Sequence, residues 1–250
     1  MKKIVVLALV GLVACGLLFA GGSKEKGGYV FGSDATWPPL EFVDESGTLA
    51  GFEVDLVAEL SKAAGVPMSV RNVAWDGIFA GLANGAYDAV ASGVSVTEER
   101  KAAMDFTTPI LEVTQSIIMN ASSTPAVDGE ALQGKVVGVQ IGTTGHFAVE
   151  KLAGVSVKAY DDIGLAVEDL LNKNLDAAVA DSLIASDFVL ENPNYAGKLV
   201  VTGTVAAETE QIAIAVKKGN SAFLTLLNDT LKKLEQDGTI AALKAKWNIL

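Results

Sequence analysis

The sequence predicts an α/β protein made of two similar lobes, and three observations support this. From Tyr29 onward, short β-rich runs alternate with segments of helical periodicity, which is typical of helices packed on mainly parallel sheets. The order strand, loop, helix begins once at Tyr29 and again at Val136. Segments 84–92 and 172–181 also match, since each holds a helix end, a turn, an Asp-Ala step and a buried strand that runs into a polar residue.

The first half of the chain predicts alternating elements in a clear order. Residues 29–32 form a strand that leads into a polar loop over 33–39. Apolar residues recur with a helical period over 52–64, and Gly65 ends that helix. The following elements are a strand at 68–73, a helix at 75–84, a buried strand at 88–91 and a helix that begins after Thr97.

The second half repeats this alternation. A strand at 136–140 precedes the turn Gly142-Thr143-Thr144-Gly145, which opens a helix that ends at Leu152. The remaining elements are strands at 155–160, 177–180 and 211–216, and helices at 163–172, 221–236 and 240–247.

Composition excludes several classes of function. The 250 residues include 30 Asp and Glu against 19 Lys and Arg, a net charge of −11, which argues against nucleic acid or an anionic membrane surface as a partner. One Cys and one His exclude a disulfide framework and a His/Cys metal site. A Ser/His/Asp hydrolase would depend on His146 alone. The chain has neither a P-loop nor a GxGxxG motif, so we expect no cofactor, and the scarcity of Cys and His argues against a metal.

The N-terminal segment predicts export. Met-Lys-Lys is followed by an almost wholly apolar run without Asp or Glu, so we interpret 1–20 as a signal peptide and the Gly-rich 21–28 as a linker. The signal could be cut after Ala20. Alternatively, 12–15 resembles a lipobox in which Cys15 becomes a lipidated N-terminus, or Cys15 is only a small apolar residue, or the segment is an uncleaved anchor. We expect a location in the periplasm or otherwise outside the cytoplasmic membrane.

Polar residues follow the predicted strands where they end. In open α/β sheets, ligands bind outside the carboxyl ends of the strands, so two facing lobes would place these residues along one cleft. The residues are Asp34, Ser92, Gly93, Ser95, Thr143, Thr144 and Asp181.

Two of these segments suit a carboxylate. Backbone N–H groups and hydroxyls at Gly93 and Ser95 come shortly before Arg100, whose guanidinium offers a bidentate, charge-assisted fork. Alternatively, Arg100 pairs with a neighbouring glutamate on its helix. The turn 142–145 lies at a helix N-terminus, where N–H groups favour anions, but it could equally be an ordinary capping turn. Asp181 suits an ammonium group, or it caps the helix that follows, or it does both.

The chain resembles a known family, the extracytoplasmic substrate-binding proteins of ABC importers. The resemblance is to the polar amino-acid branch of this family. The resemblance runs from about Tyr29 to Trp247 and depends on the order and spacing of several motifs. These are Asp-Ala-Thr-Trp-Pro-Pro-Leu-Glu-Phe (34–42), Gly-Phe-Glu-Val-Asp-Leu (51–56), Trp-Asp-Gly-Ile (75–78), the run 88–100, Met-Asp-Phe-Thr (104–107), Leu-Glu-Gln-Asp-Gly-Thr-Ile (234–240) and Lys-Trp (246–247).

The resemblance implies a two-lobed fold of the periplasmic-binding-protein type II, in which two hinge strands join lobes made of mainly parallel sheets flanked by helices. Lobe 1 would hold 29–109 and 213–250, lobe 2 would hold 115–207, and the hinges would lie near 110–114 and 208–212. The family captures a free amino acid between its lobes and delivers it to an ABC permease, with no catalysis. We expect a monomer.

The resemblance also implies roles at the head of the ligand. Arg100 and the N–H groups of Gly93 and Thr144 would hold the α-carboxylate. Asp181, Ser95 and the Gly93 carbonyl would hold the α-ammonium.

At the other end of the ligand, Trp37 and Trp75 would flank its side chain, and Asp34 and Gln140 would contact the tip. An aspartate there favours a positive or amide end, so we expect Arg, Lys or ornithine, then Gln or His, rather than Glu or Asp. The tryptophans could instead belong to the core, and Asp34 could only cap a turn.

Two other functions use the same scaffold. An enzyme such as a dehydratase or lyase of a small carboxylic acid would need a further general acid or base, and the cleft offers only Asp34 and Asp181. An extracytoplasmic amino-acid sensor would need a partner protein to pass on its signal.

Overall fold

The computed structural model describes residues 27–249. The predicted signal peptide, Cys15 and most of the predicted linker lie outside these residues, so the expectations for them remain untested. Within 27–249, no helix has the length and apolar character needed to cross a bilayer.

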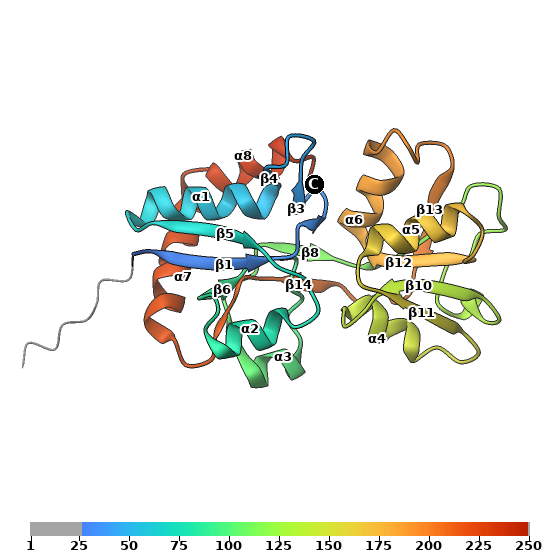
Figure 1. Cartoon of the computed structure of the whole chain (residues 1–250), viewed down its shortest axis with the longest axis horizontal. Helices are drawn as coiled ribbons and strands as arrows, with labels where there is room; N and C mark the ends of the chain where they lie inside the picture. Colours follow the sequence, from blue (N-terminus) through green and yellow to red (C-terminus); the bar gives the residue numbers. More distant parts are fainter. Residues whose placement is uncertain (1–26, 250) are drawn as a thin grey trace, which may run out of the picture.

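Lobe 1, on the left of Figure 1, is built on a five-stranded sheet of order β5-β1-β6-β15-β7. Strand β15 runs antiparallel to both its neighbours, and the other four strands run in one direction. The strands are β1 (Tyr29–Ser33), β5 (Met68–Asn72), β6 (Ala89–Val90), β7 (Met104–Phe106) and β15 (Ala215–Lys217). The helices are α1 (Phe52–Ala64), α2 (Ile78–Asn84), α3 (Glu98–Ala103), α7 (Ser221–Gln236) and α8 (Thr239–Lys246).

Lobe 2 has the same sheet plan, with the order β11-β10-β12-β9-β13 and β9 as the single reversed strand. The strands are β9 (Gln115–Asn120), β10 (Val136–Gln140), β11 (Ser156–Tyr160), β12 (Ala177–Asp181) and β13 (Leu199–Thr204). The helices are α4 (Thr144–Glu150), α5 (Ile163–Leu171), α6 (Ser182–Ser186), a 3-10 turn at Glu130–Leu132 and a π turn at Asp187–Glu191. The prediction of two similar α/β lobes is therefore confirmed.

The two matching sequence segments have the same structural role. They supply β6 and β12, each the third strand of its sheet. The Asp88 carboxylate accepts a hydrogen bond from the Val30 N–H (3.0 Å), and the Asp176 carboxylate accepts one from the Val136 N–H (2.8 Å). Each aspartate's own N–H returns to the carbonyl of the same valine at 2.8 Å. The Asp-Ala step therefore fastens the second and third strands of each sheet, β1 to β6 and β10 to β12.

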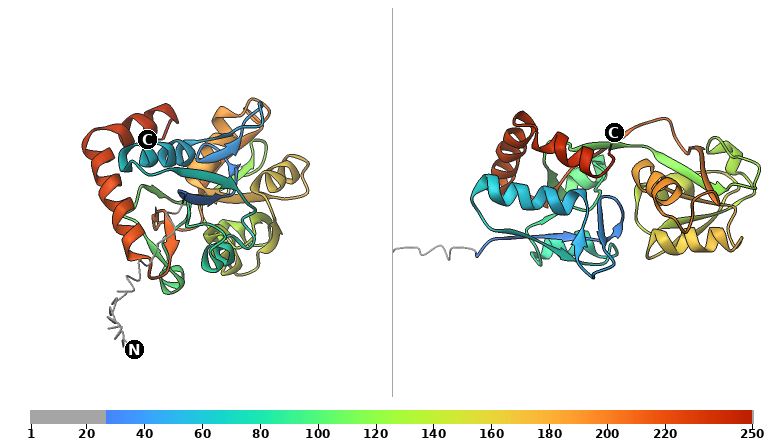
Figure 2. Two further views of the ribbon diagram at one scale, coloured as in Figure 1. Left: turned by 60° about the vertical axis from the view of Figure 1, so that its left-hand side comes forward. Right: turned by 90° about the horizontal axis from the view of Figure 1, so that it is seen from above.

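The lobes are joined by β8 (Leu111–Val113) and β14 (Glu210–Ile212), which pair antiparallel and run between the two sheets (Figures 1 and 2). The prediction of one continuous strand over 211–216 is wrong. The run belongs to β14 up to Ile212 and to β15, in the lobe 1 sheet, from Ala215. Nothing in the sequence marks where the run changes sheets, because Ile212 in β14 and Ala215 in β15 are both fully buried apolar residues.

Other differences are local. The loop predicted over 33–39 contains a short strand, β2 (Thr36–Trp37), which forms a small antiparallel sheet with β3 (Glu41–Val43) and β4 (Leu49–Ala50). The helix predicted from 75 begins at Ile78, because Gly77 before it is left-handed (φ 85°).

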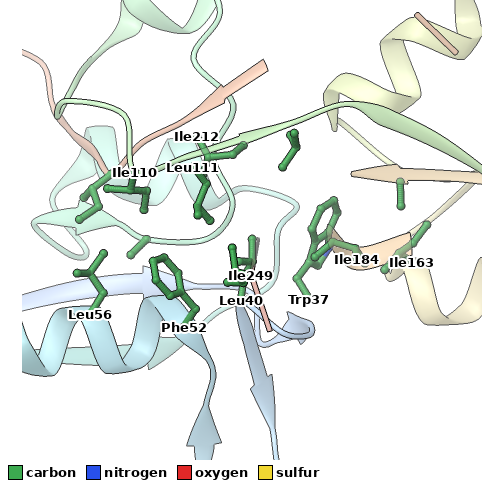
Figure 3. Packing of buried hydrophobic residues seen from close by; sticks show 14 of the residues in the cluster. Trp37, Leu40, Phe52, Leu56, Ile110, Leu111, Ile163, Ile184, Ile212 and Ile249 are labelled. Carbon is green, nitrogen blue, oxygen red and sulfur yellow. The ribbon is translucent and has the colours of Figure 1, made fainter. Parts of the chain in front are cut away.

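The largest apolar cluster extends from lobe 1 into lobe 2. Trp37 on β2 belongs to the same cluster as two residues of lobe 2 (Figure 3). These are Ile163, the first residue of α5, and Ile184 on α6. Ile212 on the connecting strand β14 is also a member. The lobes are therefore packed together through apolar contacts as well as through the site described below.

A glycine before α1 allows a close approach of two backbone segments, and this gives a stability prediction. Gly51 has φ 129°, and a Cβ on it would lie 2.2 Å from the Leu40 carbonyl oxygen. We expect Gly51→Ala to lower the free energy of unfolding by about 3 kcal/mol, since backbone must move as well as adopt a strained angle. Urea denaturation would measure this.

The matched control is Gly47→Ala, because Gly47 is also left-handed (φ 81°) but a Cβ there would have nothing within 4 Å. We expect this variant to lose only about 1 kcal/mol. Equal losses in the two variants would show that the contact with Leu40 contributes nothing.

Candidate ligand-binding site

The predicted site residues meet at a cavity between the lobes. Lobe 1 and lobe 2 both line it, and its volume is about 10 Å³, which is room for roughly one water molecule. The lining residues are Trp37, Trp75, Ser92, Gly93, Ser95, Arg100, Thr143, Thr144 and Asp181. The lobes are thus closed on each other, and a molecule larger than water could enter only if they separated.

Arg100 extends from α3 and contacts both lobes. The Thr97 hydroxyl caps this helix by accepting the Arg100 N–H (3.1 Å). The guanidinium donates to the carbonyl of Ser95 (2.9 Å) and, across the lobes, to the carbonyl of Gly142 (3.3 Å). Its carbon lies 4.9 Å from the centre of the Phe79 ring. Burial lowers the pKa of Arg100, but an arginine stays protonated at neutral pH.

The alternative that Arg100 pairs with a glutamate of its own helix is wrong. Glu98 pairs with Lys101 instead, at 2.8 Å. No carboxylate within residues 27–249 forms an ion pair with Arg100. Its positive charge is therefore held near the cavity by backbone carbonyls and aromatic rings, which leaves it able to bind an incoming anion.

Asp181 ends β12 and is 2 % exposed. Its carboxylate accepts a hydrogen bond from Gln115 Nε2 at 2.7 Å. Burial raises the pKa of Asp181 to about 7, with the Glu210 charge raising it further and Gln115 and Arg100 opposing this. Although α6 begins at the next residue, no side-chain capping bond forms, so the alternative of Asp181 as a helix cap is wrong.

Two residues of this region were missed by the sequence analysis. Gln115 on β9 also donates to Thr144 Oγ1 (3.1 Å) and, more weakly, to Glu210 on β14 (3.3 Å). The available signal for Gln115 was its place at the start of a strand whose centre, 117–119, is apolar. No sequence signal pointed to Glu210, because only the pairing of β14 with β8 places this residue near Asp181.

The backbone donors differ from the expectation at one position. The Gly93 N–H, expected to bind a ligand's carboxylate, instead donates to Glu53 Oε2 (3.0 Å). Ser95 forms an isolated antiparallel bridge with Ile212, and the hydrogen bonds of that bridge run through the residues on either side of Ser95. The Ser95 N–H therefore points away from β14 and has no partner among residues 27–249. Ser95, rather than Gly93, offers the donor.

The Gly-Thr-Thr-Gly turn combines capping with a role at the cavity. Thr143 Oγ1 caps α4 by accepting the His146 N–H (3.1 Å) and donates to the Gln140 carbonyl (2.9 Å). Thr144 Oγ1 lies 3.3 Å from Ser95 Oγ across the lobes. His146 Nδ1 accepts the Gly142 N–H (3.1 Å), so this histidine supports the turn and does not line the cavity.

Asp34 and Gln140 lie beside the cavity and bind each other across the lobes. Gln140 Nε2 donates to Asp34 Oδ2 (2.8 Å), while Gln140 Oε1 accepts the Trp37 indole N–H. The other Asp34 oxygen accepts from Thr36 (3.1 Å). Burial raises the pKa of Asp34 to about 6, and the charge of Asp162 in lobe 2 adds to this. Asp34 therefore does more than cap a turn.

Comparison with known proteins supports what this geometry indicates. The family model of the bacterial extracellular solute-binding proteins, family 3, matches residues 29–249. The chain belongs to this family.

Several named proteins and one solved structure illustrate what this family 3 protein is similar to. It is 32% identical to a probable histidine-binding protein of Neisseria gonorrhoeae, over 99% of this chain and 96% of that protein. It is 34% identical to the L-cystine-binding protein TcyJ of Escherichia coli, over 90% and 84%. The structure of an ancestral arginine-binding protein bound to arginine superposes with a TM-score of 0.84 at 37% identity, covering 89% of this chain and 98% of that one.

These relatives are binding proteins, and the family 3 protein is not an enzyme. The alternative of a dehydratase or lyase is therefore set aside. The resemblance to the binding proteins of amino-acid importers is confirmed.

Proposed function

We propose that this family 3 protein captures a free L-amino acid between its two lobes, outside the cytoplasmic membrane, and delivers it to the permease of an ABC importer. The observation that carries the proposal is that Arg100 and Asp181, which have opposite charges, line one small cavity. Relatives named for binding histidine and cystine support it.

The energetics favour a zwitterion at this site. Enclosing an amino acid removes water from both of its charges, so each must meet an opposite charge and full hydrogen bonding. Hydrogen bonds to charged groups contribute about 1.5–3 kcal/mol each. Several of them exceed the roughly 8 kcal/mol of micromolar binding and offset the cost of closing the lobes.

In this proposal each charge of the ligand has its own partners. Arg100 and the N–H groups of Ser95 and Thr144 bind the α-carboxylate. Asp181, with the Ser95 hydroxyl and the Gly93 carbonyl, binds the α-ammonium. Ser95 and Thr144 already lie 3.3 Å apart across the lobes, so a ligand between them would hold the lobes together.

The ligand's side chain is proposed to be basic, or else polar. Trp37 and Trp75 line the cavity from lobe 1 and would flank it. Asp34 lies at that end, and the Asp162 charge acts on it from the other lobe, so two carboxylates favour a cation there. Gln140, which donates to Asp34, would compete with the ligand for this carboxylate or accompany it.

Further features of the proposal concern the whole chain. The segments 110–114 and 208–212 act as hinges between lobe 1 (29–109 and 213–250) and lobe 2 (115–207). The protein works as a monomer, and it either loses its signal after Ala20 or is anchored through a lipid on Cys15. An extracytoplasmic sensor remains an alternative use of the same binding event.

A thermal-shift panel tests the function. We expect the chain without residues 1–20 to melt at a higher temperature with one or a few of the twenty L-amino acids, ornithine or cystine. Arginine, lysine, ornithine or histidine should give the largest shift. An unchanged melting temperature across the panel would contradict amino-acid binding.

The same panel tests the ligand class through Asp34→Asn. This variant should lose about tenfold in affinity for a basic amino acid, because an amide no longer attracts its positive end, and much less for glutamine. The largest shift from Glu or Asp would refute the basic class while leaving amino-acid binding intact.

A further inference from the structure

Two buried glutamates lie directly behind the proposed binding site. Glu41 on β3 and Glu53 on α1 are 0 % and 1 % exposed. None of the ion pairs among residues 27–249 includes either of them. Buried carboxylates without a cation are costly, so this pair needs a physical explanation.

Each glutamate uses one oxygen to hold the turn that lines the cavity. Glu41 Oε1 accepts a hydrogen bond from Ser92 Oγ (3.0 Å), and Glu53 Oε2 accepts one from the Gly93 N–H (3.0 Å). Ser92 Oγ in turn accepts the Asp34 N–H (2.9 Å). The two glutamates therefore hold the Ser92 side chain and the Gly93 backbone directly, and the Asp34 backbone through Ser92.

The second oxygen of each glutamate has no donor. Glu41 Oε2 and Glu53 Oε1 are both buried and have no hydrogen-bond donor among the described residues. The two carboxyl groups bind adjacent residues of one turn, and each affects the pKa of the other. Two ionised carboxylates would repel and leave both oxygens unsatisfied. One proton between them satisfies both oxygens and leaves one negative charge in place of two.

We propose that Glu41 and Glu53 share one proton, and that the resulting acid–carboxylate pair positions Ser92 and Gly93 for ligand binding. The second part rests on the proposed function, while the first does not. Glu41 is the acid: its Oε2 carries the proton and donates to Glu53 Oε1. Glu53 is the carboxylate, which accepts this bond and the Gly93 N–H.

The electrostatic surroundings agree with this assignment. Burial is the largest cause that raises the pKa of both glutamates. The charges of Glu53 and Asp34 raise the pKa of Glu41 further, whereas the Gly93 N–H lowers that of Glu53. The groups that face the pair are thus Ser92, Gly93 and Asp34, and none of them is a cation.

Infrared spectroscopy of the protein tests the shared proton. At neutral pH we expect the C=O band of a buried protonated carboxylic acid. Glu41→Gln should remove it, because the amide N–H replaces the proton as the donor to Glu53; Glu53→Gln is the second variant if the first does not fold. The matched control, Glu59→Gln, alters a partly exposed glutamate that is paired with Lys62 and should keep the band. Asp34→Asn and Asp181→Asn identify any contribution from the other buried acids.

Ligand binding tests the positioning role. Glu41→Gln should bind the best amino acid of the panel within about twofold of the original protein, whereas Glu41→Ala should bind it about tenfold more weakly, the loss of roughly one hydrogen bond. A missing band in the original protein, or a band that both glutamine variants retain, overturns the shared proton. Unchanged affinity in a folded Glu41→Ala overturns the positioning role. If no amino acid binds the original protein, the proposed function fails, and the infrared result still decides the proton.

Discussion

Arg100→Ala is expected to lower amino-acid affinity by about 100-fold or more, measured by isothermal titration calorimetry. Removing one partner of an enclosed, hydrogen-bonded charge pair costs about 3–5 kcal/mol, because the remaining charge is left without compensation. Here that charge would be the ligand's α-carboxylate. Arg100 is not engaged by any carboxylate among residues 27–249, so no internal ion pair is lost and the protein should remain folded.

Two further variants make this result specific. Arg100→Lys keeps the charge but not the planar fork, and we expect an intermediate affinity. Arg71→Ala removes an exposed arginine whose side chain, within residues 27–249, donates only to the Ala86 carbonyl (3.2 Å), and this variant should bind as the original protein does. An Arg100→Ala variant with unaltered affinity would remove the carboxylate partner from the proposal.

Amino-acid affinity is expected to fall strongly at low pH because of Asp181, and this is the second large effect. The pKa of this aspartate is raised to about 7, so in neutral solution the ligand-free protein often carries a proton where the ammonium should bind. Proton and ligand then compete, and affinity falls about tenfold for each pH unit below 7. Between pH 8 and pH 5 we expect a loss of roughly 100-fold. Titrations across this range provide the measurement.

Asp181→Asn should weaken binding at pH 8 by about 100-fold and remove most of this pH dependence. The stability of the ligand-free protein should depend on pH in the opposite sense to affinity: Asp181 raises the affinity as the pH rises, but it lowers the free energy of unfolding. A raised pKa means that the folded state keeps a proton that the unfolded chain, with its pKa of 3.8, has released. Asp181 therefore costs stability progressively as the pH rises from about 4 to 7, and its replacement by asparagine should raise the melting temperature at pH 8.

Asp229→Asn is the matched control, since Asp229 is exposed on α7. It should alter neither affinity nor its pH profile. If Asp181→Asn retains the pH dependence of the original protein, a different group is responsible, and the assignment of the ammonium site to Asp181 is wrong.

Much of the architecture could be predicted because its signals are local. The periodicity of 52–64 and the glycine after it predicted α1, and the repeated Asp-Ala step predicted two equivalent strands. The run 211–216 was predicted less well, because the point at which it passes from β14 to β15 depends on strands far away in the sequence.

The site shows the same division. Asp181 at the end of β12, and the segment 92–95 that leads from β6 towards Arg100, could be selected from the sequence, since ligands bind where parallel strands end. Their partners could not. Gln115 reaches Asp181 only through the pairing of β9 with β12, and Gly93 loses its free N–H only because Glu53 lies beneath it.

The sequence by itself determined a two-lobed α/β protein with opposite charges and small polar residues at the ends of its strands. This follows because hydrophobic periodicity, turn residues and strand ends each depend on residues that are close together in the sequence. The tertiary structure alone decided which donors remain free, that Gln140 joins Asp34 across the lobes, and that Glu41 meets Glu53. Each of these depends on burial and on contacts between residues distant in the chain, which no local pattern records.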